Sequence, residues 1–155
     1  MLKPLALLLL TATAAIAQDA PVLAEYATDS GSLPPEYAWE TSVTILADGR
    51  LTLKHCKGYE TEGPACKTRR AKVSDEALAA ILAAARDSDL AAHPAQQAEY
   101  PMVGGGSVSG AVYLDGAKIT LLSQPAEADA ARVGKVLQAI AAAIPPRFDR
   151  FTHPD

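Results

Sequence analysis

The stretch TSVTILADGRLTL, residues 41–53, decides the fold, because apolar and polar residues alternate on both sides of one turn. A two-residue Asp-Gly turn would put the apolar side chains of the two strands on opposite faces. A three-residue loop at residues 47–49, with its glycine in the left-handed conformation, keeps them on one face. Only this register gives the hairpin a single apolar face, so we predict it. It pairs Ile45 with Leu51 and Val43 with Leu53.

The start of the chain has the pattern of a secretory signal peptide. Lys3 supplies a positive charge, a leucine-rich apolar run follows, and Ala15-Ile16-Ala17 matches a small-x-small cleavage site. The apolar run is too short for a transmembrane segment. We therefore expect cleavage after Ala17 and a periplasmic or secreted protein.

The two cysteines follow the first hairpin. In an oxidising compartment, Cys56 and Cys66 are expected to form a disulfide that closes a short loop. The chain-entropy model gives such a loop about 2.5–3 kcal/mol of stabilisation. Placing the cysteines opposite each other makes KTRRAKV, residues 67–73, a third strand. That register sets Thr52 against Arg70 and Lys54 against Thr68.

Two alanine-rich segments predict helices. The first begins after Ser74, a good N-cap residue, and the second follows Pro125 and ends at Pro145-Pro146. Between them, residues 108–122 predict a second hairpin with a two-residue Asp-Gly turn. Its register pairs Val112 with Ile119 and Leu114 with Ala117.

The order βββα–ββα predicts an α+β fold. We expect a two-layer sandwich, with an antiparallel sheet of about five strands and two helices on one face. The other sheet face should be polar and exposed. Residues 18–37 mix Pro, Gly, Ser and acidic residues without a period, and predict a flexible leader. Residues 38–155 then form a single α+β domain, whose aromatic C-terminal tail either docks or stays mobile.

The net charge of −4 argues against nucleic acid as a general partner. Against this background, basic residues cluster around the cysteine loop and form what we call the basic strip. An acidic envelope protein or another anionic ligand would suit it, with Arg50, Lys54, Arg70 and Lys72 as the residues expected to bind the partner. The alternative is a solvated sheet face whose charges discourage edge pairing. The whole strip comprises Arg50, Lys54, Lys57, Lys67, Arg69, Arg70 and Lys72.

A second candidate site lies in the long connection at residues 87–107. His93, Glu99 and Tyr100 carry polar groups there, and His93 is a candidate general base. No nucleophile has a recognisable spacing to it, so a surface loop is the simpler interpretation. The Cys-x9-Cys spacing does not match a zinc site. We predict no catalytic residue, no metal site and no cofactor.

These observations favour an exported, non-enzymatic binding or accessory protein, such as an inhibitor or a factor of an envelope complex. One alternative is a small-molecule or anion binder that uses the basic strip or the 87–107 loop. The remaining alternative is an enzyme, namely a hydrolase with an unrecognised site.

Overall fold

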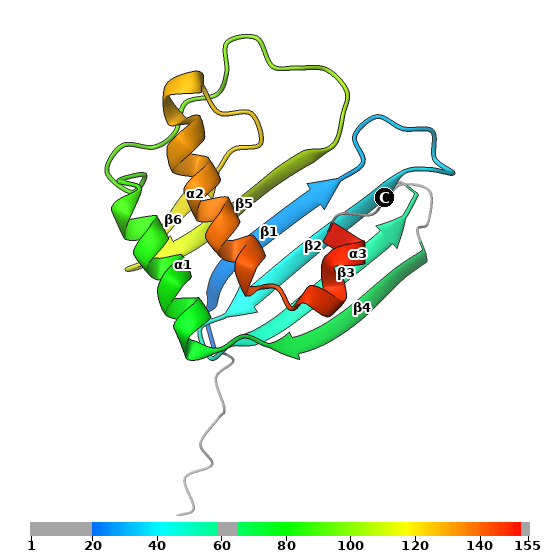
Figure 1. Cartoon of the computed structure of the whole chain (residues 1–155). Coiled ribbons are helices and arrows are strands. Elements are labelled where there is room, and N and C mark those ends of the chain that lie inside the picture. Colours follow the sequence, from blue (N-terminus) through cyan, green and yellow to red (C-terminus); the bar gives the residue numbers. More distant parts are fainter. Residues whose placement is uncertain (1–19, 59–64, 153–155) are drawn as a thin grey trace, which may run out of the picture.

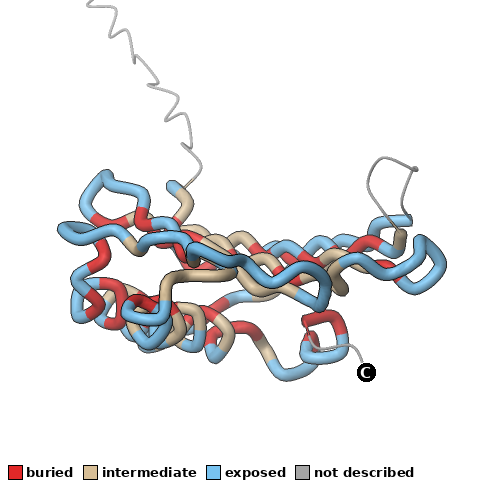
Figure 2. Tube along the Cα trace, turned by 90° about the horizontal axis from the view of Figure 1, so that it is seen from above, coloured by how far each residue is buried: buried red, intermediate tan, exposed pale blue. Residues whose placement is uncertain are grey.

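The computed structural model describes residues 20–58 and 65–152. They form one antiparallel sheet in the order β4-β3-β2-β1-β5-β6, with the helices packed on a single face (Figure 1). No helix of the described residues lies over the other face of the sheet (Figure 2). The predicted α+β class is confirmed, and the sheet contains six strands where about five were expected. The predicted signal peptide lies outside the described residues.

The six strands and three helices follow in chain order. The strands are β1 (Val22–Asp29), β2 (Trp39–Leu46), β3 (Arg50–Lys57), β4 (Ala65–Lys72), β5 (Ser107–Leu114) and β6 (Ala117–Leu121). A 3₁₀ turn at Pro146–Phe148 precedes the last helix. The helices are α1 (Asp75–Asp87), α2 (Glu127–Ala143) and the short α3 (Asp149–Thr152).

The flexible leader predicted for residues 18–37 is wrong over residues 22–29. These residues form β1, a central strand that pairs with β2 on one side and β5 on the other. Its helix-facing positions include Ala24, Tyr26 and Thr28, all of them buried. The small side chains of Ala24 and Thr28 weaken the apolar alternation that marks a strand. These positions of β1 are buried because the strand packs against the rest of the protein, which the local sequence pattern does not reveal.

Both predicted hairpin registers are confirmed. In the first, Ile45 pairs with Leu51, and in the second, Val112 pairs with Ile119. Gly49 has a φ of +83°, as the three-residue loop requires. A Cβ atom at Gly49 would lie 2.7 Å from the backbone oxygen of Val73, so close packing also restricts this position to glycine.

The helices begin and pack much as their sequences indicate. The Ser74 hydroxyl accepts a hydrogen bond from the Ala77 amide and caps α1. Alanines on the inner side of α1 let the helix lie close to its neighbours. Both long helices contribute to the core; the buried residues are Leu78, Ile81, Ala84 and Ala85 from α1, and Val133, Val136, Ile140 and Ala143 from α2.

The C-terminal segment docks on the helix side of the sheet. Phe148 and Phe151 are both buried in the core. The Thr41 hydroxyl of β2 donates a hydrogen bond of 2.5 Å to the backbone carbonyl of Phe151. This contact holds α3 beside the ends of β2 and β3, where a group of charged side chains gathers.

We expect Tyr26→Ala to lower the free energy of unfolding by about 3 kcal/mol, because it removes a large buried side chain from the central strand. Tyr37→Ala is the matched control from the same predicted leader. Tyr26 is 3% exposed and Tyr37 is 67% exposed, so the control should change stability by less than about 0.5 kcal/mol. Urea denaturation measures both, and equal effects would contradict the central position of β1.

Candidate functional site: the basic ribbon of β3 and β4

The register of β3 against β4 divides the basic strip into two groups. Thr52 pairs with Arg70, Lys54 with Thr68, and Cys56 with Cys66, as the sequence predicts. Successive residues of a strand point to opposite faces of the sheet. The strip therefore supplies one group of cations to the open face and another to the helix side.

We call the group on the open face the basic face. All four of its side chains are exposed, and they are the residues predicted to bind a partner. Arg50 lies directly opposite Lys72 across the two strands, and its Nε is 2.7 Å from a carboxylate oxygen of Asp48. The basic face consists of Arg50, Lys54, Arg70 and Lys72.

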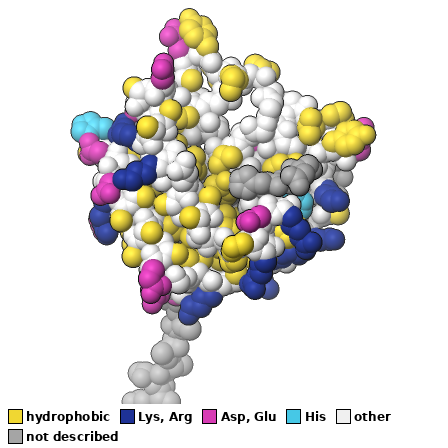
Figure 3. All heavy atoms as spheres, in the orientation of Figure 1, with side chains coloured by type: hydrophobic (Ala, Val, Ile, Leu, Met, Phe, Trp, Pro, Cys, Tyr) yellow, Lys and Arg dark blue, Asp and Glu magenta, His cyan; other side chains and the backbone are white. Residues whose placement is uncertain are grey.

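The group on the helix side lines a cavity, which we call the basic pocket. This cavity of about 400 Å³ is open to solvent and lies between the ends of β3 and β4 and the short helix α3. Figure 3 shows Lys and Arg side chains gathered at this edge of the molecule beside a histidine. The lining residues are His55, Lys57, Ala65, Lys67, Arg69, Arg150 and Phe151.

The Phe151 ring orders two of these cations. The guanidinium carbon of Arg69 lies 4.4 Å from the ring centroid, and that of Arg150 lies 4.8 Å from it. Both distances suit a cation–π contact. Among the described residues, none of the four cations Lys57, Lys67, Arg69 and Arg150 forms an ion pair with a carboxylate.

His55 is the buried titratable group of the pocket. Its Nδ1 lies 2.8 Å from the Thr41 hydroxyl oxygen. Because that hydroxyl gives its own hydrogen to Phe151, Nδ1 must donate, which leaves Nε2 unprotonated in the neutral ring. Burial lowers the pKa of His55, and the positive charges of Lys57, Arg69 and Lys67 lower it further.

The predicted disulfide is present and ties the two strands of the ribbon together. Cys56 and Cys66 are bonded directly across β3 and β4. The bond lies on the same face as Lys54 and Arg70, since these positions are two or four residues from a cysteine along each strand. It therefore fixes the register that separates the two groups of cations.

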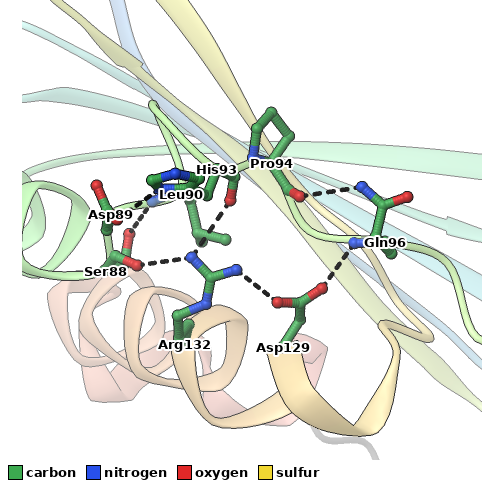
Figure 4. Close-up of polar contacts among 8 residues, drawn as sticks. All are labelled: Ser88, Asp89, Leu90, His93, Pro94, Gln96, Asp129 and Arg132. Carbon is green, nitrogen blue, oxygen red and sulfur yellow. Dashed lines mark hydrogen bonds and ion pairs between the residues drawn. The ribbon is translucent and has the colours of Figure 1, made fainter.

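The second candidate site, in the long connection, is tied down by α2 (Figure 4). The Asp129 carboxylate accepts a 2.8 Å hydrogen bond from the Gln96 amide. Arg132 donates to the backbone oxygens of Ser88 and His93 at 3.1 and 3.2 Å. The Gln96 amide and then Arg132 lower the pKa of Asp129. These contacts hold the first part of the connection against the helix.

The structure does not gather the three residues named for this loop. His93 places Nδ1 2.7 Å from the Asp89 carboxylate on the surface. Tyr100 is 84% exposed, and Glu99 is also exposed. Among the described residues, the only side chain within hydrogen-bond distance of the His93 imidazole is that of Asp89, and this pair has a structural explanation as an i,i+4 contact.

Sequence reasoning missed several residues that shape these sites. Arg150 and Phe151 lie far along the chain from β4, and nothing local links them to it. His55 precedes Cys56 in the sequence, and no spacing to another residue marks it as part of a site. In the sequence, Asp129 and Arg132 look like ordinary residues of the polar face of a helix. Their spacing of three residues is the one feature that could have predicted that the two side chains pair.

The described part of the chain contains no group of three or more His, Cys, Asp or Glu side chains placed to hold a metal ion. Among the same residues, no helix has the length and apolar character needed to cross a membrane. No protein-family model matches the chain, and no curated protein matches it significantly.

The lowered pKa of His55 makes stability depend on pH. The unfolded chain binds this proton more readily than the folded protein, so stability falls as the pH drops below the unfolded value of about 6.5. His55→Asn keeps a donor for Thr41. This variant should lose less of its free energy of unfolding between about pH 7.5 and about pH 5.5 than the unaltered protein does. Chemical denaturation at each pH tests this, and parallel curves for the two proteins would refute it.

We expect Arg132→Ala to release the first part of the long connection. Amide hydrogen exchange over residues 88–97 should become about ten-fold faster, because charge-assisted hydrogen bonds to two backbone carbonyls are lost. Arg86→Ala, an exposed arginine in the last turn of α1, is the control. Unchanged exchange in the Arg132 variant would show that other contacts hold the connection.

Proposed function

We propose that this chain is an exported, non-enzymatic binding protein whose basic face binds an acidic segment of a partner protein. The observation that carries the proposal is the β3–β4 register, which collects four cations on the face of an edge ribbon that no described helix covers. The chain as a whole has a net charge of −4, so this local excess of positive charge stands out. Complementary charge favours an acidic partner.

The edge position of β4 supports the same proposal. An edge strand leaves a row of backbone groups without partners, and basic side chains on it repel a second copy of the same edge. An extended acidic segment would meet no such repulsion and would gain both charge contacts and backbone hydrogen bonds. The charges of β4 thus disfavour self-association while they favour an acidic ligand.

The affinity expected for an acidic partner follows from the solvent exposure of the basic face. Each exposed ion pair contributes about 0.2–1 kcal/mol, and Arg50 already pairs with Asp48, so the basic face supports moderate, salt-sensitive affinity. Their larger effect is on the association rate, since clustered charge steers an oppositely charged partner. We therefore expect binding that weakens markedly as ionic strength rises.

Export is part of the proposal. The signal-peptide pattern of residues 1–17 supports it, and so does the disulfide, because such bonds persist in oxidising compartments. Binding is favoured over catalysis because both described histidines have structural contacts. His55 bonds to the hydroxyl that anchors Phe151, and His93 pairs with Asp89 on the surface.

The test compares two charge reversals of equal size on opposite faces of the ribbon. A fluorescent oligoglutamate peptide is the probe, and anisotropy measures its binding at low and moderate salt. Arg70→Glu with Lys72→Glu should weaken binding at least about ten-fold. Lys57→Glu with Lys67→Glu makes the same change in net charge on the helix side and should weaken binding by less than about three-fold. Equal losses would overturn the proposed face.

A further inference from the structure

We propose that the basic pocket binds a phosphate-type oxyanion, a compact tetrahedral group with about two negative charges. This inference goes beyond the acidic-partner proposal, because the pocket opens on the opposite side of the β3–β4 ribbon. A variant of one site therefore leaves the side chains of the other in place.

Four cations converge on the pocket from three separate elements. Lys57 comes from β3, Lys67 and Arg69 from β4, and Arg150 from α3, and no described carboxylate lines the cavity. Like charges brought together in this way repel one another. An anion in the cavity relieves that repulsion. The convergence also depends on tertiary docking, since Phe151 must pack beside β3 before Arg150 can contribute.

Arg69 and Arg150 are held in place before a ligand binds. Their guanidinium groups are held near the Phe151 ring, and Arg69 is itself half-buried. A contact with an aromatic ring leaves the N–H groups at the guanidinium edge available as donors. Two guanidinium groups ordered in advance suit the oxygen atoms of a tetrahedral oxyanion and reduce the entropy lost on binding.

His55 adds a group that responds to the charge of the ligand. Its neutral ring donates from Nδ1 to Thr41 and leaves Nε2 free to take up a proton from solvent. Burial and the positive charges of Lys57, Arg69 and Lys67 oppose that proton. A bound dianion offsets their charge, so the imidazole of His55 becomes easier to protonate when the site is filled.

Size and charge select the ligand class. A cavity of about 400 Å³ holds a phosphate group with a short attached chain. The four cations of its lining suit a compact group that carries about two negative charges. Free phosphate, a soluble phosphate monoester and a phosphate-bearing lipid headgroup share the chemistry that the pocket recognises.

The experiment titrates the full mature chain with inorganic phosphate at constant ionic strength and follows the amide and imidazole resonances by NMR. Chloride and acetate serve as control anions. We expect saturable shifts at the pocket residues and a rise in the pKa of His55. Arg69→Gln should weaken phosphate binding at least ten-fold. Arg70→Gln, the adjacent residue on the opposite face, should change it by less than two-fold.

A second variant and a vesicle assay complete the test. Arg150→Gln, on the exposed side of α3, replaces the Arg69 variant if that protein is unfolded. Flotation with phosphatidylcholine vesicles containing phosphatidic acid, against vesicles containing phosphatidylserine, tests the lipid source. Arg69-dependent binding of either phosphate or phosphatidic acid supports the proposal. It is overturned if neither binds, or if Arg70→Gln weakens binding as much as Arg69→Gln.

Discussion

The pairing of β3 with β4 is the constraint on which the candidate sites depend. The side-chain period of a strand is two, so a slip of one residue would exchange the two faces of the ribbon. The three-residue loop at Gly49 sets the β2–β3 register, and the Cys56–Cys66 bond sets the β3–β4 register. With both in place, Leu51 and Leu53 enter the core and the cations divide between the open face and the helix side.

Strand β1 makes the sheet continuous. It lies between β2 and β5 and joins the strands that carry the basic ribbon to the later hairpin. Its pairing also brings Thr41 of β2 opposite Thr28, next to the site where the C-terminal segment docks. The basic pocket therefore depends on contacts between residues that are far apart in the sequence, since Arg150 reaches β4 only after α3 has packed on the sheet.

The features that could be predicted from the sequence are those that depend on interactions between nearby residues. The turn at Gly49, the cap at Ser74, the second hairpin and the disulfide each follow from residues close together in the chain. The four residues proposed to bind a partner share a face because the predicted β3–β4 register is correct. Strand β1 escaped prediction because Ala24 and Thr28 occupy buried positions without the bulk that marks a buried strand.

The pocket escaped prediction for a different reason. Arg69 is recognisable as part of a basic cluster, yet its ordering depends on Phe151 of a tail that has no periodic signal. In the sequence His55 is distinguished only by its position next to Cys56, whereas its place in the pocket follows from the hydrogen bonds of Thr41. Long-range pairing of this kind leaves no trace in the local sequence pattern.

The register of β3 and β4 can be measured directly by interstrand nuclear Overhauser effects in the isotopically labelled, oxidised protein. The account predicts short Hα–Hα contacts that join Thr52 to Arg70 and Lys54 to Thr68. Contacts that instead joined Thr52 to Arg69 or to Ala71 would contradict it, because the cations would then lie on the wrong faces.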